Sequence, residues 1–149
     1  MASGKGHIVG GFIFLLVLLH IISHYFYRPS LLDLVLYVAI GLMFAVWPDV
    51  DIKSLGQKFF YTVFFLVDLI LIYLEEYKIA AYFGLIIILP ILAKHRGWTH
   101  SRITAILLPT PLMLVPMYMS GGSLMEGLPY YFAAVTGYFS HLFFDKKLL

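Results

Sequence analysis

Long apolar runs separated by short polar segments are the feature that most limits how this chain can fold. A helix needs roughly 20 predominantly apolar residues to cross a bilayer. The sequence predicts six such helices, at about 7–27, 31–47, 58–75, 78–93, 101–119 and 128–145. Only 12% of the residues are charged, about half the share in a soluble domain. We therefore expect an all-α polytopic membrane protein, a bundle of about six transmembrane helices that forms a single domain over residues 1–149.

The basic residues predict how this bundle is oriented. Six alternating spans place both termini and the loops 48–57 and 94–101 on one side of the membrane. Eight of the ten basic residues fall on that side: Lys5, Lys53, Lys58, Lys94, Arg96, Arg102, Lys146 and Lys147. Loops rich in Lys and Arg stay in the cytoplasm, so we expect cytoplasmic termini in a multi-pass protein of the cell membrane.

Composition argues against nucleic-acid binding and rules out sites that depend on cysteine. The net charge is +2 and the basic residues are dispersed, which disfavours a nucleic-acid partner. Cysteine is absent, which removes disulfides, thiolate metal sites and a cysteine nucleophile together. Any metal must then be held by nitrogen and oxygen atoms.

Four polar clusters interrupt the apolar sequence, and the alternating topology places all four on the predicted cytoplasmic side. They are Gly6-His7, Pro48-Asp49-Val50-Asp51, the segment from His95 to Ser101, and the segment from Ser140 to Asp145. Four histidines and three carboxylates gathered at one rim form a donor set that suits Zn²⁺, with Mn²⁺ and Fe²⁺ as alternatives. The candidate metal ligands are His7, Asp49, Asp51, His95, His100, His141 and Asp145.

Two of these clusters contain carboxylates. His141 and Asp145 are four residues apart, so on a helix they share one face. Asp49 and Asp51 follow a proline, and an extended backbone would point them apart. Either a turn brings both to the site, or one binds metal while the other acts as general base. The alternative is that Asp49 merely ends a helix in water.

The third cluster pairs two imidazoles with a cation. His95 and His100 flank Gly97, whose conformational freedom allows a tight loop to fold both inward. Arg96 is a natural binder of phosphate or carboxylate beside a metal, or it serves only as positive-inside charge.

The roles of three further residues in these clusters stay open. Thr99 and Ser101 either orient the histidines or cap the fifth helix. His7 starts the first span and is either a ligand or an interfacial bystander.

The order of these motifs resembles the YdjM-like family of predicted membrane-bound metal-dependent hydrolases, over essentially the whole chain. The strings His-Arg-Gly-Trp-Thr-His-Ser at 95–101 and Gly-Tyr-Phe-Ser-His-Leu-Phe-Phe-Asp at 137–145 carry the resemblance. It implies an inner-membrane hydrolase whose metal site is made by these His and Asp residues. A fainter similarity to soluble zinc-dependent phospholipases C suggests phosphoester substrates.

These observations favour a membrane metallohydrolase with one or two ions at the cytoplasmic interface. Asp49 or Asp51 would accept the proton of water, and Arg96 would bind the anionic substrate. A site at headgroup depth favours a lipid or amphiphilic substrate. The alternative is a metal-ion or small-solute transport protein, although transporters usually place polar groups near the membrane midplane and carry repeats. The oligomeric state stays open.

A few polar residues and prolines lie deeper in the spans. We expect Asp68, inside the third span, to pair with His20 or His24, because a carboxylate in lipid needs a partner. His20 and His24 are four residues apart and leave open a second metal site. Pro109, Pro111 and Pro116 should kink or unwind the fifth span.

Overall fold

The computed structural model describes residues 4–50, 54–88, 98–114, 121 and 123–145, and this part of the chain is helical. Its elements are α1 (Gly4–Tyr25), α2 (Leu31–Val46), the 3-10 turn η1 (Trp47–Asp49), α3 (Leu55–Tyr73), α4 (Tyr77–Ile88), the 3-10 turn η3 (Trp98–His100), α5 (Arg102–Leu107) and α7 (Leu124–Phe144). The all-α prediction is thus confirmed for the described residues.

Helical residues occupy all six predicted spans. Three helices are long and apolar enough to cross a membrane, Lys5–Tyr25, Leu31–Asp49 and Gly56–Tyr73, and the helix Arg102–Leu114 is apolar but shorter. Membrane residence is supported by these helices, while the count of six spans stays a prediction.

The fifth span is interrupted at one of its prolines. Helix α5 ends at Leu107, residues 108 and 109 form a turn, and the helix resumes at 110–114. Pro109 has no amide hydrogen to donate, so the predicted local unwinding is confirmed there. Pro116 lies outside the described residues.

Serine caps set where the helices begin. Ser30 Oγ accepts from the amide of Asp33, and the Asp33 carboxylate accepts from the amide of Ser30, at 3.2 and 3.1 Å, which is a capping box at the start of α2. Ser54 Oγ accepts from the amide of Gln57 and donates to the carbonyl of Asp49, at 3.0 and 2.8 Å. This serine therefore ties the first turn of α3 to η1 and holds Asp49 in place.

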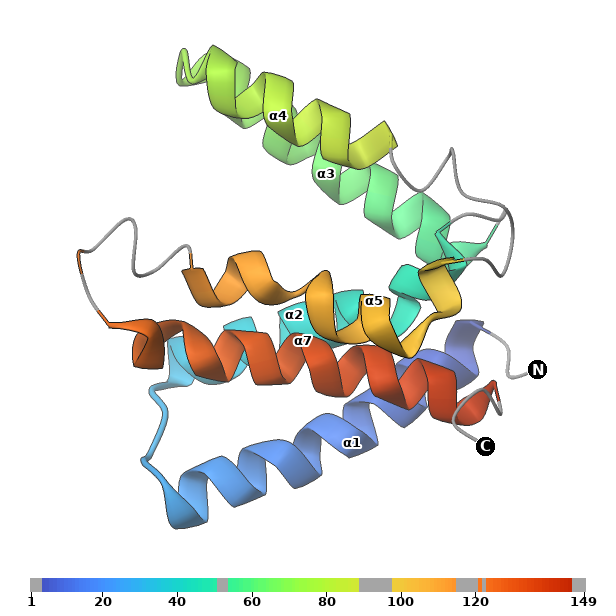
Figure 1. Cartoon of the computed structure of the whole chain (residues 1–149), viewed down its shortest axis with the longest axis vertical. Coiled ribbons are helices and arrows are strands. Elements are labelled where there is room, and N and C mark those ends of the chain that lie inside the picture. The colour runs from blue at the N-terminus through green and yellow to red at the C-terminus, as the bar shows by residue number, and fades with distance from the viewer. Residues whose placement is uncertain (1–3, 51–53, 89–97, 115–120, 122, 146–149) are drawn as a thin grey trace.

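The centre of the molecule is a close packing of α1, α2 and α7. A Cβ atom built on Gly137 of α7 would lie 1.9 Å from the carbonyl oxygen of Gly41 on α2, and one built on Gly11 of α1 would lie 2.6 Å from Cβ of Ala45. Small residues of this kind let helix backbones approach closely in membranes. In Figure 1, α1 begins and α7 ends at the same end of the molecule.

Helices α3 and α4 form a hairpin that diverges from this three-helix body (Figure 1). It is anchored near the start of α3, where the ring of Phe60 packs edge-on against Trp47 at a centroid distance of 4.5 Å. Towards its far end α3 exposes large apolar side chains, among them Leu69, Ile70 and Tyr73. Such a surface suits contact with lipid.

The predicted pairing of Asp68 with His20 or His24 is wrong. Asp68 lies on α3, and both histidines lie on α1, on the opposite side of α2 and α7 (Figure 1). Both histidines are exposed. The prediction matched depth along the helix axis, and depth does not determine which helices are neighbours.

Candidate metal centre

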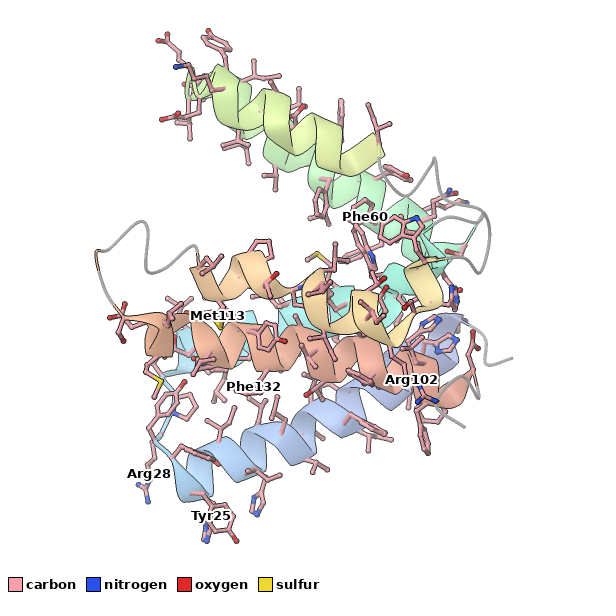
Figure 2. The ribbon with its side chains drawn as sticks, in the orientation of Figure 1. Tyr25, Arg28, Phe60, Arg102, Met113 and Phe132 are labelled. Carbon is pink, nitrogen blue, oxygen red and sulfur yellow. The ribbon has the colours of Figure 1, made fainter. Side chains whose placement is uncertain are left out.

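One end of the three-helix body gathers a residue from each of the four polar clusters. His7 comes from the first turns of α1, Asp49 from η1 after α2, His100 from η3 before α5, and His141 and Asp145 from the end of α7. Figure 2 shows side-chain nitrogen and oxygen atoms crowded at this end, near the labelled Arg102. The other predicted site residues, Asp51, His95 and Arg96, lie outside the described residues.

Four of these residues surround a common point. The Nε2 atoms of His100 and His141 each lie 3.6 Å from Asp49 Oδ1 and 3.7 Å from Asp145 Oδ2. One ligand atom from each of the four residues lies within 4.8 Å of all the others. Two imidazoles thus alternate with two carboxylates around a small space.

These distances fit metal coordination better than hydrogen bonding. An N–H···O hydrogen bond spans 2.7–3.2 Å, and all four distances exceed that range. Two atoms bound tetrahedrally to one zinc ion, each about 2.1 Å from it, lie about 3.4 Å apart. The side chains are therefore spaced as ligands of a shared cation would be.

Because these side chains are largely buried, a cation bound between them would stabilise the folded protein. The side chains of His141 and Asp145 are 0% and 3% exposed, and that of Asp49 is 15% exposed. His141 Nε2, Asp49 Oδ1 and Asp145 Oδ1 have no hydrogen-bond partner within the described residues. Unsatisfied polar atoms in such a place are costly, and a cation would satisfy nitrogen lone pairs and carboxylate charge together.

A hydrogen bond to a backbone carbonyl orients the imidazole of His141. His141 Nδ1 donates to the carbonyl of Ala45 at 2.8 Å. Because a carbonyl only accepts, Nδ1 carries the hydrogen and Nε2 of the neutral ring presents its lone pair to the centre. Metal-binding histidines commonly use their second ring nitrogen in this way.

His100 is positioned through a longer chain of contacts. Its Nδ1 lies 3.2 Å from Thr99 Oγ1, and the hydroxyl of Tyr138 donates to the carbonyl of Thr99. Ser101 instead caps α5, since its Oγ accepts from the amide of Ile103 at 3.2 Å. Of the two predicted roles, Thr99 therefore orients a histidine, and Ser101 caps the fifth helix.

Sequence reasoning missed the supporting residues Ala45 and Tyr138. Ala45 acts through its backbone, which no side-chain pattern reveals. Tyr138 stands three residues before His141 on α7, so it is on the same side of the helix, and this spacing was the available signal.

Comparison with known families identifies the one to which this chain belongs. The family described as YdjM inner membrane protein matches residues 1–146. The chain belongs to the YdjM inner membrane protein family. The predicted resemblance is confirmed, and membership of this family supports residence in the inner membrane. Comparisons with curated proteins and with solved structures found no match.

The YdjM match includes all five residues that meet at the end of the body. The centre therefore lies within the part of the chain that the family match covers.

Proposed function

We propose that this chain is an integral membrane metal-dependent hydrolase that cleaves a phosphoester in a lipid or other amphiphile at the cytoplasmic interface. Asp49, His100, His141 and Asp145 would hold a divalent transition metal, with zinc favoured by the two-imidazole, two-carboxylate donor set and Mn²⁺ or Fe²⁺ as alternatives. The observation that carries the proposal is the arrangement of two buried imidazoles and two largely buried carboxylates, whose facing nitrogen and oxygen atoms lie 3.6–3.7 Å apart.

The chemistry divides between the ion and the protein. A divalent ion supplies Lewis acidity, which makes water a better nucleophile at neutral pH and stabilises charge on a phosphoryl oxygen. The protein holds the His141 imidazole in one tautomer through Ala45, and the fully buried Tyr138 holds Thr99 beside His100. Asp49 is the more exposed of the two carboxylates, so it is the one placed to accept a proton from a solvent water.

Two further roles in this proposal rest on the sequence alone, because their residues lie outside the part of the chain that the structure describes. Asp51 would serve as the proton acceptor in place of Asp49 if Asp49 only binds metal. Arg96 would bind the phosphoryl oxygens, because a guanidinium matches their geometry with two hydrogen bonds.

The place of the centre supports an amphiphilic substrate. His7 and Asp145 lie at the start and the end of apolar helices, and α1 carries exposed Val9, Ile13 and Val17 along its length. The ends of such helices reach the headgroup region of a bilayer. A phosphoester anchored by an apolar chain would arrive at that depth without leaving the membrane.

Metal or solute transport is the competing function. It requires groups that bind the transported ion near the middle of the spans, exposed alternately to both sides. Here the four described ligands lie at one end of the body, which favours hydrolysis.

Metal analysis followed by a substrate screen tests the proposal. The full chain, purified in detergent, should contain zinc or another transition metal in stoichiometric amount. It should also hydrolyse nitrophenyl phosphoesters or phospholipids in mixed micelles, and His141→Ala should abolish both properties. His24→Ala, at an exposed histidine of α1, is the matched control. A preparation without metal, and without activity after metal is added, would contradict the proposal. Metal that exchanges across proteoliposomes without hydrolysis would favour transport.

A further inference from the structure

We propose that the centre holds a second divalent cation between His7 and Asp145, and that the Asp145 carboxylate bridges the two ions. This inference rests on the proposed metal centre and specifies its nuclearity. His7 is outside the group of four residues whose ligand atoms are mutually within 4.8 Å, yet it is in direct contact with that group.

The first argument is that the two oxygens of Asp145 face different partners. Oδ2 lies 3.7 Å from the Nε2 atoms of both His100 and His141. Oδ1 lies 3.5 Å from His7 Nε2. A carboxylate whose oxygens address separate imidazoles is arranged to bridge, with one oxygen for each ion.

The distance from His7 to Asp145 is again that of a shared ion. At 3.5 Å it exceeds the 2.7–3.2 Å of an N–H···O hydrogen bond. It matches the separation of about 3.4 Å between two ligands of one tetrahedral zinc. His7 is 1% exposed, and Asp145 Oδ1, the oxygen that faces His7 Nε2, has no hydrogen-bond partner within the described residues. Without a cation this pair would be a costly buried contact.

The second argument comes from the stacking of two imidazoles. The rings of His7 and His141 lie 3.8 Å apart between centroids, with an interplanar angle of 15°. A metal binds imidazole through a ring nitrogen in the plane of the ring, so two parallel rings place their ions side by side at about the same separation. Paired ions in phosphoesterases lie about 3.5–4 Å apart, which is the spacing that this stack provides.

Helix packing explains why His7 reaches this position. A Cβ built on Gly11 would meet Ala45, and one built on Gly10 would lie 2.0 Å from the ring of Phe144. The two glycines let the start of α1 approach both α2 and the end of α7. His7 lies one turn before them and is thereby brought onto His141.

A second ion would extend the proposed chemistry. It supplies another positive charge at the point where a phosphoester would bind, so that both the attacking and the leaving oxygen can be stabilised. Because His7 and Asp145 are only two protein ligands, water and substrate oxygens would complete its coordination.

The experiment counts metal ions and measures their coupling. Zinc titration of the full chain in detergent, followed by elemental analysis, should give about two ions per chain. His7→Gln should retain about one, and His20→Gln, which changes an exposed histidine of the same helix, should retain two. One ion per chain in the unmodified protein, or two in His7→Gln, would overturn this inference and leave the hydrolase proposal intact. No bound metal would overturn both.

Electron paramagnetic resonance gives a second readout, and its decisive measurement is made on the unmodified chain. The unmodified chain loaded with Mn²⁺ should show the exchange-coupled spectrum of a close manganese pair. His7→Gln should show the six-line spectrum of an isolated ion. A six-line spectrum from the fully loaded unmodified chain would contradict the bridge, even if His7→Gln fails to fold.

Discussion

The two ends of α1 carry the same side chain in opposite settings. His7, in the first turns, is 1% exposed, stacks on His141 and contacts Asp145. His20 and His24, four residues apart near the other end, are exposed and stack on each other at 5.9 Å. Among the described residues, neither belongs to a group able to hold a metal ion. The i, i+4 spacing of these two histidines left a second metal site open, but no third ligand joins them in the part of the chain that the structure describes.

The difference lies in what packs against each end. At the His7 end, Gly10 and Gly11 bring α1 against α2 and α7, which contribute Ala45, His141 and Asp145. At the other end, the large side chains of Tyr25, Phe26 and Leu31 are exposed. A metal centre thus requires convergence of several elements, and a pair of histidines on one helix does not provide it.

Removing a proposed metal ligand that packs against the His7 end of α1 should have the largest effect. We expect His141→Ala to weaken zinc binding by on the order of 100-fold or more, since loss of a supporting contact alone costs 10–100-fold. His24→Ala should leave affinity unchanged. Zinc competition with a chromogenic chelator measures both. Equal losses in the two variants would mean that the two ends of α1 do not differ.

Blocking the convergence of the helices should have the next largest effect. In Gly137→Ala the added methyl group would clash with the carbonyl oxygen of Gly41, and overpacking of this kind costs about 1–3 kcal/mol. Gly84→Ala on α4 is the control, because a Cβ there meets nothing within 4 Å and alanine favours helix. Thermal unfolding in detergent should show a lower Tm for Gly137→Ala only. An unchanged Tm would show that the contact between α2 and α7 is dispensable.

Loosening a supporting contact should have a smaller effect. Tyr138→Phe removes the hydrogen bond to the carbonyl of Thr99, so we expect zinc affinity to fall by about 10-fold. Tyr131→Phe is the matched control, since Tyr131 lies on the same helix α7 as Tyr138 and its hydroxyl donates to the carbonyl of Ile106 on α5. The same chelator competition applies. A fall of equal size in Tyr131→Phe would assign the effect to general destabilisation.

The smallest effect is expected at Asp68. This carboxylate lies on α3 and lines a cavity of about 440 Å³ with Tyr61, Thr62, Phe65 and Leu66. Because none of these residues belongs to the metal centre, Asp68→Asn should leave metal content and zinc affinity unchanged by elemental analysis and competition. A loss of metal would show that the hairpin takes part in the centre.

Patterns along the chain predicted much of this fold and part of the candidate site. Apolar runs gave the positions of the helices, and counting alternating spans placed four polar clusters on one side. Residues from all four clusters meet in the structure. Asp51, His95 and Arg96 stay predictions, since they lie outside the described residues.

Other features were not predictable in this way. The pairing of Asp68 failed because depth along a helix says nothing about which face it turns or which helix it meets. The carbonyl of Ala45 that orients His141, and the carbonyl of Thr99 that accepts from Tyr138, belong to backbone brought close by the helix packing, and no residue type marks them.

The sequence by itself determined the membrane character, the family and the donor atoms available for a metal, because these follow from apolar length, motif order and side-chain chemistry. Only the tertiary structure decided which donors share a point. That choice depends on glycines that leave no room for a side chain between the helices, at the contact of Gly11 with Ala45 and at that of Gly137 with Gly41. The same contacts placed His7 on His141 and left His20 and His24 exposed. Close packing determines which residues of different helices become neighbours, whereas a sequence pattern determines only the spacing of residues along a single helix.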